Sequence, residues 1–590
     1  MRTSIYSFLV LFLIANPIFG HIIYVNHLAG GANDGTNWQD AYHDPHDALS
    51  EALSGDTIWV AEGIYYPSLS GDKGAYFELK NGVKLMGGFA GTETLLNERD
   101  WAAHPTILSG DIGLPGDSTD NSYTILYIGA SDTTTLVDGL TFVRGNADGP
   151  AVFDRNLVRS GGALYIMGEN SYAYPRIWNC RFEHNYALKF GGAAYVNGVN
   201  GSVAPQFYNC VFVANHAGAD GGAIRRDGGS WVEVKNDFWN CSFIQNSAGQ
   251  NGGAIFYRDT ERTDTLEFVG CSFQQNLANN LGGGIAQFGG RASGMKVFVV
   301  GCVFEENIAP RGGGYHYFSG FLYTDFAIFQ GCSFIANQVS YSGSGCHIDA
   351  LFLDDSYTNL LFDHCLFKMN IAESESGAHL LIGADLGHCE IKQCDFIKHV
   401  PGFFASSNIF CDLSFALLDG CNFQQNTFEA NYESALIRFH LKAPLIFTNN
   451  TCIGNNLQNG SIFRASSNSF TNEISNCTIY GNITNAQTAM VVPGKYHISN
   501  TIIVADSLTP TSFPINATSI QIDNSLLSTA NCSSLPASVT CGPSMLFNLD
   551  PLFADTAAHD FTLLPCSPAI DAGDSAIVDS LGITTDIAGN

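Results

Sequence analysis

The sequence has 590 residues, of which 26 are Lys or Arg and 55 are Asp or Glu, and its formal net charge is -29. An acidic surface of this size repels nucleic acid and anionic membranes, so we expect neither as a partner. Hydrophobic residues make up 45% of the chain, which excludes a disordered stalk. After residue 20 no segment approaches the roughly 20 apolar residues of a membrane helix.

The N-terminal segment predicts export followed by a cap. Residues 1–20 contain an Arg near the start, an apolar run and a terminal Gly20, as a secretory signal peptide does. Next, DPHDALSEAL predicts a short helix and SGDTIWVAEGIYYP predicts a buried strand. Because a solenoid needs a cover over its first coil, we assign residues 21–105 to an N-terminal cap and the first coils.

A loop with the sequence LSGDIGLPGDSTDNS carries clustered acidic residues. Asp111, Asp117 and Asp120 offer oxygen ligands of the kind that calcium prefers, so we predict them as candidate calcium ligands and calcium as the candidate cofactor. Their spacing is not that of an EF-hand. The alternative is that each Asp accepts hydrogen bonds from its own turn.

A motif then recurs every 27 to 33 residues. Phe follows the motif cysteine by two residues in nine copies, and Asn follows Phe by three residues in all of these except the copy with His399. The motif cysteines are Cys180, Cys210, Cys241, Cys271, Cys302, Cys332, Cys365, Cys394, Cys421 and Cys477, with Asn450 in the same place once. Such regularity is typical of a solenoid with one coil per repeat.

The residues around each cysteine indicate the kind of solenoid. Cys and Phe, two residues apart, share the inward face of a strand. Asn or Gly directly before Cys, as at Asn179 or Gly270, tolerates left-handed backbone and places a corner there. A Gly-Gly pair about six residues past the Asn marks another corner and a third strand. We therefore predict an all-β fold, a parallel β-helix with coils of about 30 residues over residues 106–545.

Stacking of the coils in register has consequences for several residue types. The motif cysteines form an internal column of free thiols, whereas Cys532 and Cys541 lie outside that column and are predicted to form a disulfide. The Asn residues from Asn185 to Asn426 hydrogen-bond along the stack.

We assign residues 546–590, after the last repeats, to a C-terminal capping segment.

Equivalent residues just after the glycine pairs are candidates for binding glycans. Tyr165, Tyr195, Arg225 and Phe256 point outward if the residues directly before them point inward, and then form an aromatic ladder on which sugar rings stack. The opposite parity makes these four side chains part of the core.

Cations on neighbouring repeats give an enzymatic alternative. A calcium-assisted polysaccharide lyase needs carboxylates to hold the metal and an Arg or Lys to accept a proton. The candidates are Arg225, Arg226, Arg258 and Arg262, with Asp259 and Asp264. Ordinary solvated positions explain such residues equally well, and the catalytic residues stay unknown.

Two resemblances follow from these motifs. GGALY, GGAIR and GGAIF, with FEHN, FVAN and FIQN, resemble the repeats of chlamydial polymorphic outer-membrane proteins over roughly residues 140–430. The whole chain is closer still to secreted right-handed parallel β-helix proteins of Bacteroidota, through IYVN, GGFAGTET and the terminal SPAIDAGD, whose Pro568 and Ile570 we expect against the last coil. The resemblance implies a right-handed helix and an extracellular or outer-surface location.

Together these features predict an exported monomer for adhesion or glycan binding, without catalysis, whose partner is a polysaccharide or cell-surface glycan. The alternative function is a polysaccharide lyase or glycoside hydrolase that acts on a groove of the β-helix.

Overall fold

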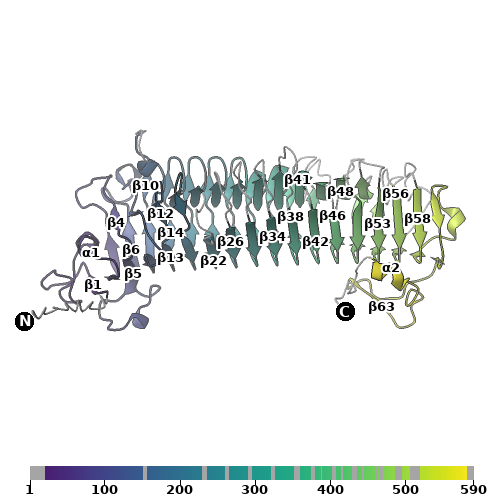
Figure 1. Cartoon of the computed structure of the whole chain (residues 1–590), viewed down its shortest axis with the longest axis horizontal. Coiled ribbons are helices and arrows are strands. Elements are labelled where there is room, and N and C mark those ends of the chain that lie inside the picture. The colour runs from purple at the N-terminus through teal and green to yellow at the C-terminus, as the bar shows by residue number, and fades with distance from the viewer. Residues whose placement is uncertain are drawn as a thin grey trace, which may run out of the picture.

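The protein forms one elongated body of stacked parallel strands (Figure 1). The computed structural model describes residues 20–150, 156–228, 236–258, 265–289, 296–319, 326–350, 359–373, 379–386, 388–401, 407–413, 416–427, 435–441, 444–458, 461–465, 470–484, 495–504 and 519–580. This is the right-handed parallel β-helix that the repeats predict.

Each coil contributes one strand to each of up to four sheets, which we call sheets 1 to 4, and a full coil passes through them in the order 1, 2, 4 and 3. Sheet 1 has 18 strands in the described part of the chain. They are β1 (Ile22–Val25), β2 (Thr57–Ala61), β5 (Lys84–Phe89), β8 (Leu136–Asp138), β13 (Arg176–Trp178), β18 (Gln206–Tyr208), β22 (Asn236–Trp239), β26 (Thr265–Val269), β30 (Lys296–Val300), β34 (Phe326–Gln330), β38 (Asn359–Asp363), β42 (His388–Lys392), β46 (Ala416–Asp419), β49 (Leu445–Thr448), β53 (Thr471–Ser475), β56 (Lys495–Ser499), β58 (Ser519–Asp523) and β60 (Val539–Cys541).

Sheet 2 follows sheet 1 after a one-residue corner. Its strands are β3 (Gly63–Tyr65), β6 (Thr106–Ser109), β9 (Leu140–Val143), β14 (Arg181–Glu183), β19 (Val211–Val213), β23 (Ser242–Ile244), β27 (Ser272–Gln274), β31 (Val303–Glu305), β35 (Ser333–Ile335), β39 (Leu366–Lys368), β43 (Asp395–Ile397), β47 (Asn422–Gln424), β50 (Thr451–Ile453), β54 (Thr478–Tyr480), β57 (Ile502–Val504), β59 (Leu526–Leu527) and β61 (Leu546–Phe547).

Sheet 3 follows the glycine pairs. Its strands are β4 (Phe77–Leu79), β7 (Leu126–Ile128), β11 (Leu164–Met167), β16 (Ala194–Asn197), β21 (Ile224–Asp227), β25 (Ile255–Arg258), β29 (Ile285–Phe288), β33 (Tyr315–Ser319), β37 (Cys346–Ala350), β41 (Leu380–Leu386), β45 (Ser407–Leu413), β48 (Ala435–Leu441) and β52 (Ser461–Ala465).

The remaining elements are short. Sheet 4 lies between sheets 2 and 3 in each coil and contains β10 (Asn146–Ala147), β15 (Tyr186–Ala187), β20 (His216–Ala217), β24 (Ser247–Ala248), β28 (Leu277–Ala278), β32 (Ile308–Arg311), β36 (Gln338–Ser342), β40 (Ile371–Ala372) and β44 (Val400–Pro401). Outside these sheets are β12 (Tyr172–Ala173), β17 (Ser202–Val203), β51 (Asn456–Gln458), β55 (Ile483–Thr484), β62 (Phe553–Asp555), β63 (Asp560–Leu563), α1 (Pro45–Glu51), α2 (Ser575–Ser580), and the 3-10 turns η1 (Leu96–Glu98), η2 (Ser118–Asp120), η3 (Asn156–Val158) and η4 (Cys532–Ser534).

Both predicted corners are present. The residue before the motif cysteine has positive φ, for example 51° at Asn179 and 62° at Gly270. In the glycine pairs the first residue has positive φ, and a Cβ on the second, Gly222, would lie 2.0 Å from the Gly253 carbonyl oxygen. The first glycine is thus needed for backbone conformation, and the second for the close approach of stacked coils.

Side chains stack inside the helix as identical rows. The motif phenylalanines from Phe142 to Phe423 lie parallel, with ring centroids 4.7 to 5.0 Å apart. The motif cysteines are buried and free, and Cys532 forms a disulfide with Cys541, as predicted. In the Asn row, Asn276 Nδ2 donates to Asn307 Oδ1 at 2.9 Å. These rows fix the register of the coils, because a slip by one residue would expose all of them.

The two ends differ from each other. The predicted helix is α1, whose Ala48 and Leu49 pack into the core against the first strands, with Asp44 accepting a hydrogen bond from the His46 N–H as the N-cap. The C-terminal segment instead turns back along the body, so that β63 and α2 lie beside sheet 2 below β53 and β58 (Figure 1). Ile570, expected against the last coil, is 39% exposed.

Candidate functional site

The residues predicted to form an aromatic ladder lie in register on sheet 3. Tyr165, Tyr195, Arg225 and Phe256 are paired on β11, β16, β21 and β25. They are on the face away from the central core, which contains the preceding residue Leu164. Their exposed fractions, however, are 0, 3, 4 and 4%. They do not form an exposed ladder, which corrects the expectation of a sugar-stacking surface here.

Side chains from the turn before the glycine pairs cover this face of sheet 3. The Phe190 ring centroid lies 5.7 Å from that of Tyr195 and 3.7 Å from the Arg225 guanidinium carbon. Phe190 and Asp220 occupy the same place in successive coils, where their backbones are bridged. Alternation along β16 leaves two directions open for Tyr195, and it does not show that the turn carrying Phe190 lies over the ring.

Arg225 is part of a buried ion-pair cluster. Its Nε and Nη2 atoms donate to Asp227 at 2.9 and 2.8 Å, and Nη1 pairs with Asp220. The Tyr195 hydroxyl donates to the same Asp227 carboxylate at 2.8 Å. Burial, followed by the Asp227 charge, raises the pKa of Tyr195 well above its ordinary value. Arg225 and Tyr195 therefore donate to buried carboxylates, and the cluster holds the coil together.

The other arginines of the predicted lyase groove do not form a groove together with Arg225 in the described part of the chain. Arg226 points to the opposite side of β21, where its Nη2 donates to the Val203 carbonyl at 2.7 Å and its guanidinium lies 4.9 Å from the Tyr257 ring. Arg258 is exposed. Asp259, Arg262 and Asp264 lie outside the described residues.

The three candidate calcium ligands each serve their own loop. Asp111 accepts from the Gly116 N–H at 3.0 Å and pairs with Arg144 at 2.5 Å. Asp117 accepts from the Thr119 N–H at 2.9 Å, and Asp120 accepts from the Leu114 N–H at 2.7 Å. Among the described residues no group of three or more His, Cys, Asp or Glu side chains is arranged to hold a metal. The three carboxylates therefore make the hydrogen bonds that the turn alternative describes, and calcium binding by this loop stays a prediction.

An exposed aromatic column that the prediction missed lies on the outer face of sheet 1. Trp178, Tyr208 and Trp239 are in register on β13, β18 and β22. The ring centroids of Trp178 and Tyr208 are 6.1 Å apart, Tyr208 is 41% exposed, and the two tryptophans are half-buried. The signal was present in the sequence, because an aromatic residue directly precedes Asn-Cys in IWNC, FYNC and FWNC. Each follows an inward residue, so alternation places each ring outside.

Amide side chains run beside these rings at the corner. Asn179, Asn209 and Asn240 follow the three aromatic residues, and each has positive φ. Asn209 Nδ2 donates to Asn179 Oδ1 at 2.8 Å, and Asn179 Nδ2 donates to Asp138 Oδ1 at 2.8 Å. Asn209 and Asn240 are exposed. We call Trp178, Tyr208, Trp239, Asn179, Asn209 and Asn240 the aromatic–amide face.

A pocket of about 420 Å³ opens at the N-terminal end of this face. Trp178 and Arg176 form its wall next to the ring column, and Lys84 and Leu136 line it on the preceding strands. Its far side rests on a small apolar cluster outside the main core, made of Trp59, Met86, Phe89 and Leu136, against which Trp178 packs. The pocket and the aromatic–amide face are therefore one continuous surface of sheet 1.

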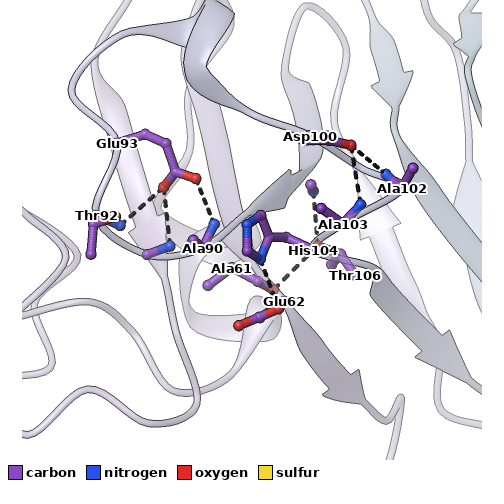
Figure 2. Close-up of polar contacts among 12 residues, drawn as sticks. Ala61, Glu62, Ala90, Thr92, Glu93, Asp100, Ala102, Ala103, His104 and Thr106 are labelled. Carbon is purple, nitrogen blue, oxygen red and sulfur yellow. Dashed lines mark hydrogen bonds and ion pairs between the residues drawn. The ribbon is translucent and has the colours of Figure 1, made fainter.

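Polar contacts fix the loop after β5, which carries the pocket residues Leu96 and Arg99. Figure 2 shows the Glu93 carboxylate accepting from backbone N–H groups, among them Ala90 at 2.6 Å and Thr92 at 3.0 Å. Burial alone would raise the pKa of Glu93, but these hydrogen bonds lower it below its ordinary value. Asp100 likewise accepts from the N–H groups of Ala102 and Ala103, and His104 contacts Glu62 (Figure 2). The wall of the pocket is thus preorganised.

A second hollow, of about 900 Å³, lies between the C-terminal segment and the outer face of sheet 2. The segment is held there by Phe561, whose ring centroid is 5.2 Å from that of Tyr480, and by the Asp574 N–H, which donates to Asn500 at 2.8 Å. Its floor includes the hydrogen-bonded polar pair Asn422 and Thr451, at 2.7 Å. No exposed ring column accompanies these residues, so we treat the surface of sheet 1 as the candidate site.

One comparison with known protein families agrees with the repeat architecture. The model of the Chlamydia polymorphic membrane protein repeat matches residues 240–258, which contain one motif cysteine and one glycine pair. No curated protein matches the chain. Among solved structures, pectate lyase Pel9A is similar, with 13% sequence identity, coverage of 76% of this chain and 79% of that chain, and a TM-score of 0.27. In the described residues no helix is long and apolar enough to cross a membrane. The chain is a parallel β-helix repeat protein.

Proposed function

We propose that the protein is an exported or cell-surface β-helix that binds polysaccharide, without cleaving it, on the aromatic–amide face. The observation that carries this proposal is the column of Trp178, Tyr208 and Trp239, which are in register on the outer face of sheet 1, with Tyr208 exposed and the tryptophans half-buried. Aromatic faces stack against the apolar faces of sugar rings, and neighbouring amides donate to and accept from hydroxyl groups. Strands spaced by about 4.8 Å present such groups at a regular interval along an extended ligand.

The proposed location rests on different observations. Residues 1–20 have the pattern of a signal peptide, and all of them except Gly20 lie outside the described part of the chain. The repeat match is to a family whose name describes membrane proteins. Both support export to the cell surface or the medium.

The lyase or hydrolase alternative loses its main support, because Arg225 is buried in its ion pairs. Asp138, the carboxylate in register with Trp178, is already paired with Arg99. Binding without cleavage is the function that the geometry supports best.

Electrophoresis of residues 21–590 through gels that contain single polysaccharides tests the proposal. We expect at least one neutral or acidic polymer to retard the protein, and Trp178→Ala, Tyr208→Ala and Trp239→Ala together to abolish the retardation. A matched control, Tyr172→Ala with Tyr341→Ala, removes exposed rings elsewhere and should retain it. Equal retardation of the triple variant and the native protein overturns the proposal. Release of reducing ends or unsaturated uronates from the polymer would favour the enzymatic alternative.

A further inference from the structure

The pocket at the end of the aromatic–amide face contains more positive than negative charge. Lys84, Arg99 and Arg176 line it, with Asp138 as the one carboxylate among its lining residues. Arg99 is occupied, because it pairs with Asp138 and donates to the Gly87 carbonyl at 3.3 Å. Asp138 is occupied as well, since it also accepts from Asn179. Two cations remain without a counter-charge.

Lys84 and Arg176 have no ion-pair partner in the described part of the chain. The Arg176 guanidinium carbon lies 4.9 Å from the centroid of the Trp178 ring. Its Nε is buried and has no hydrogen-bond partner among the described residues. In a chain with a formal charge of -29, acidic partners are abundant, so two unpaired cations in one pocket form a distinctive feature.

The register places these cations on either side of one residue. Lys84 pairs with Leu136, and Leu136 pairs with Arg176, on the adjacent strands β5, β8 and β13. Two strand spacings separate their Cα atoms by roughly 10 Å. Leu136 is buried and forms the floor between them. An anionic group above this floor lies within reach of the Lys84 ammonium and the Arg176 guanidinium. The planar, forked donors of a guanidinium match the geometry of a carboxylate or a sulfate.

We propose that this pocket binds a carboxylate or sulfate group of the polysaccharide, so that the ligand is an acidic glycan. This inference rests on the proposed function, because the sugar that carries the anion continues onto the ring of Trp178 and the aromatic–amide face. The acidic remainder of the surface acts at longer range and is screened beyond about 8 Å at physiological ionic strength. Inside the pocket, the nearby charges of Lys84 and Arg176 determine that an anionic group binds.

Matched polymer pairs test the inference at physiological ionic strength. The first pair is polygalacturonate and its methyl ester, and the second is dextran sulfate and dextran. We expect the native protein to bind the acidic member of at least one pair roughly tenfold more tightly, as two charge-assisted contacts imply. Preference in the first pair identifies a carboxylate, and preference in the second identifies a sulfate.

Variants assign that preference to the pocket. Lys84→Gln with Arg176→Gln should remove it and leave weaker, charge-independent binding by the rings. Lys398→Gln with Lys495→Gln changes the net charge equally at exposed sites elsewhere and should retain it. Arg176→Lys, which keeps the charge without the fork, should give an intermediate preference and covers the case in which the double variant does not fold.

The outcomes separate the two proposals. Equal binding of acidic and neutral polymers overturns the acidic ligand. A preference unchanged in the Lys84 and Arg176 variants overturns the pocket as its binding site. The ring column stands in both cases. Absence of binding to every polymer, or binding that survives loss of the three rings, overturns the proposed function and this inference with it.

Discussion

Arg225 and Asp227 form a two-pronged ion pair, with Nε and Nη2 at 2.9 and 2.8 Å from the carboxylate, and both side chains are buried. Arg225→Gln should therefore lower the free energy of unfolding by about 3 to 5 kcal/mol, because it leaves Asp227 and Asp220 as uncompensated buried charges. Urea unfolding measures this difference. Arg181→Gln, which removes an exposed pair with Glu183, is the control and should cost about 1 kcal/mol or less. A negligible effect of Arg225→Gln would contradict a structural role for this cluster.

The Asn row makes a second stability prediction. Asn276 donates to the Phe243 carbonyl and to Asn307, both at 2.9 Å, and accepts from the Asn246 backbone and side-chain N–H groups, both at 3.0 Å. Asn276→Ala leaves these buried groups without partners, so we expect a loss of at least about 3 kcal/mol. Gln275→Ala, at the neighbouring exposed position, should cost far less. Similar unfolding midpoints for the two variants would show that the Asn row contributes little to the stability of the β-helix.

Buried histidines should make the β-helix sensitive to acid. Burial, with a contribution from Arg311, lowers the pKa of His347 to about 3, and burial lowers the pKa of His399 to about 3. Since the unfolded chain binds these protons near pH 6.5, the stability is fully present above that pH and falls as the pH drops toward 3. Each histidine contributes about 1.4 kcal/mol per pH unit in that window.

Urea unfolding at pH 7.5 and pH 5 checks this dependence. His347→Gln should reduce the difference between the two pH values, whereas His364→Gln, at an exposed position, should leave it unchanged. If both variants retain the native pH dependence, other groups cause the acid sensitivity.

The cysteine column predicts a reactivity pattern. Burial raises the pKa of the Cys477 thiol to about 12, and of the described free cysteines Cys566 alone is exposed. In the native protein a thiol reagent should therefore modify Cys566 first. After unfolding without a reductant, all of the 17 cysteines except Cys532 and Cys541 should react. Few reactive thiols in the unfolded protein would mean that the column is oxidised.

The repeated rows could be predicted because stacking turns each sequence position into a column. The spacing of Cys, Phe and Asn was enough to place the corners at Asn179 and its equivalents and to predict the row of Asn276 and Asn307. Alternation left two directions open for Tyr165 and Tyr195, and the packing of Leu164 in the core shows that the outward one is correct. The same alternation, applied to IWNC, FYNC and FWNC, would have found Trp178, Tyr208 and Trp239.

What covers an outward face could not be predicted from alternation along a strand. Tyr195 and Arg225 are buried because Phe190 and Asp220, each five residues earlier in the turn before the glycine pair, lie against them. The backward turn of the C-terminal segment depends on contacts across large sequence separations, such as Tyr480 with Phe561. Short-range patterns carry no information on such contacts.

The most direct test of the binding surface is a crystal structure of the protein with an oligosaccharide cut from the polymer that it binds best. We predict density for sugar rings on the outer face of sheet 1, stacked on Tyr208 and Trp178, with an acidic group between Lys84 and Arg176. Density confined to the hollow beside the C-terminal segment, with sheet 1 bare, would contradict the account.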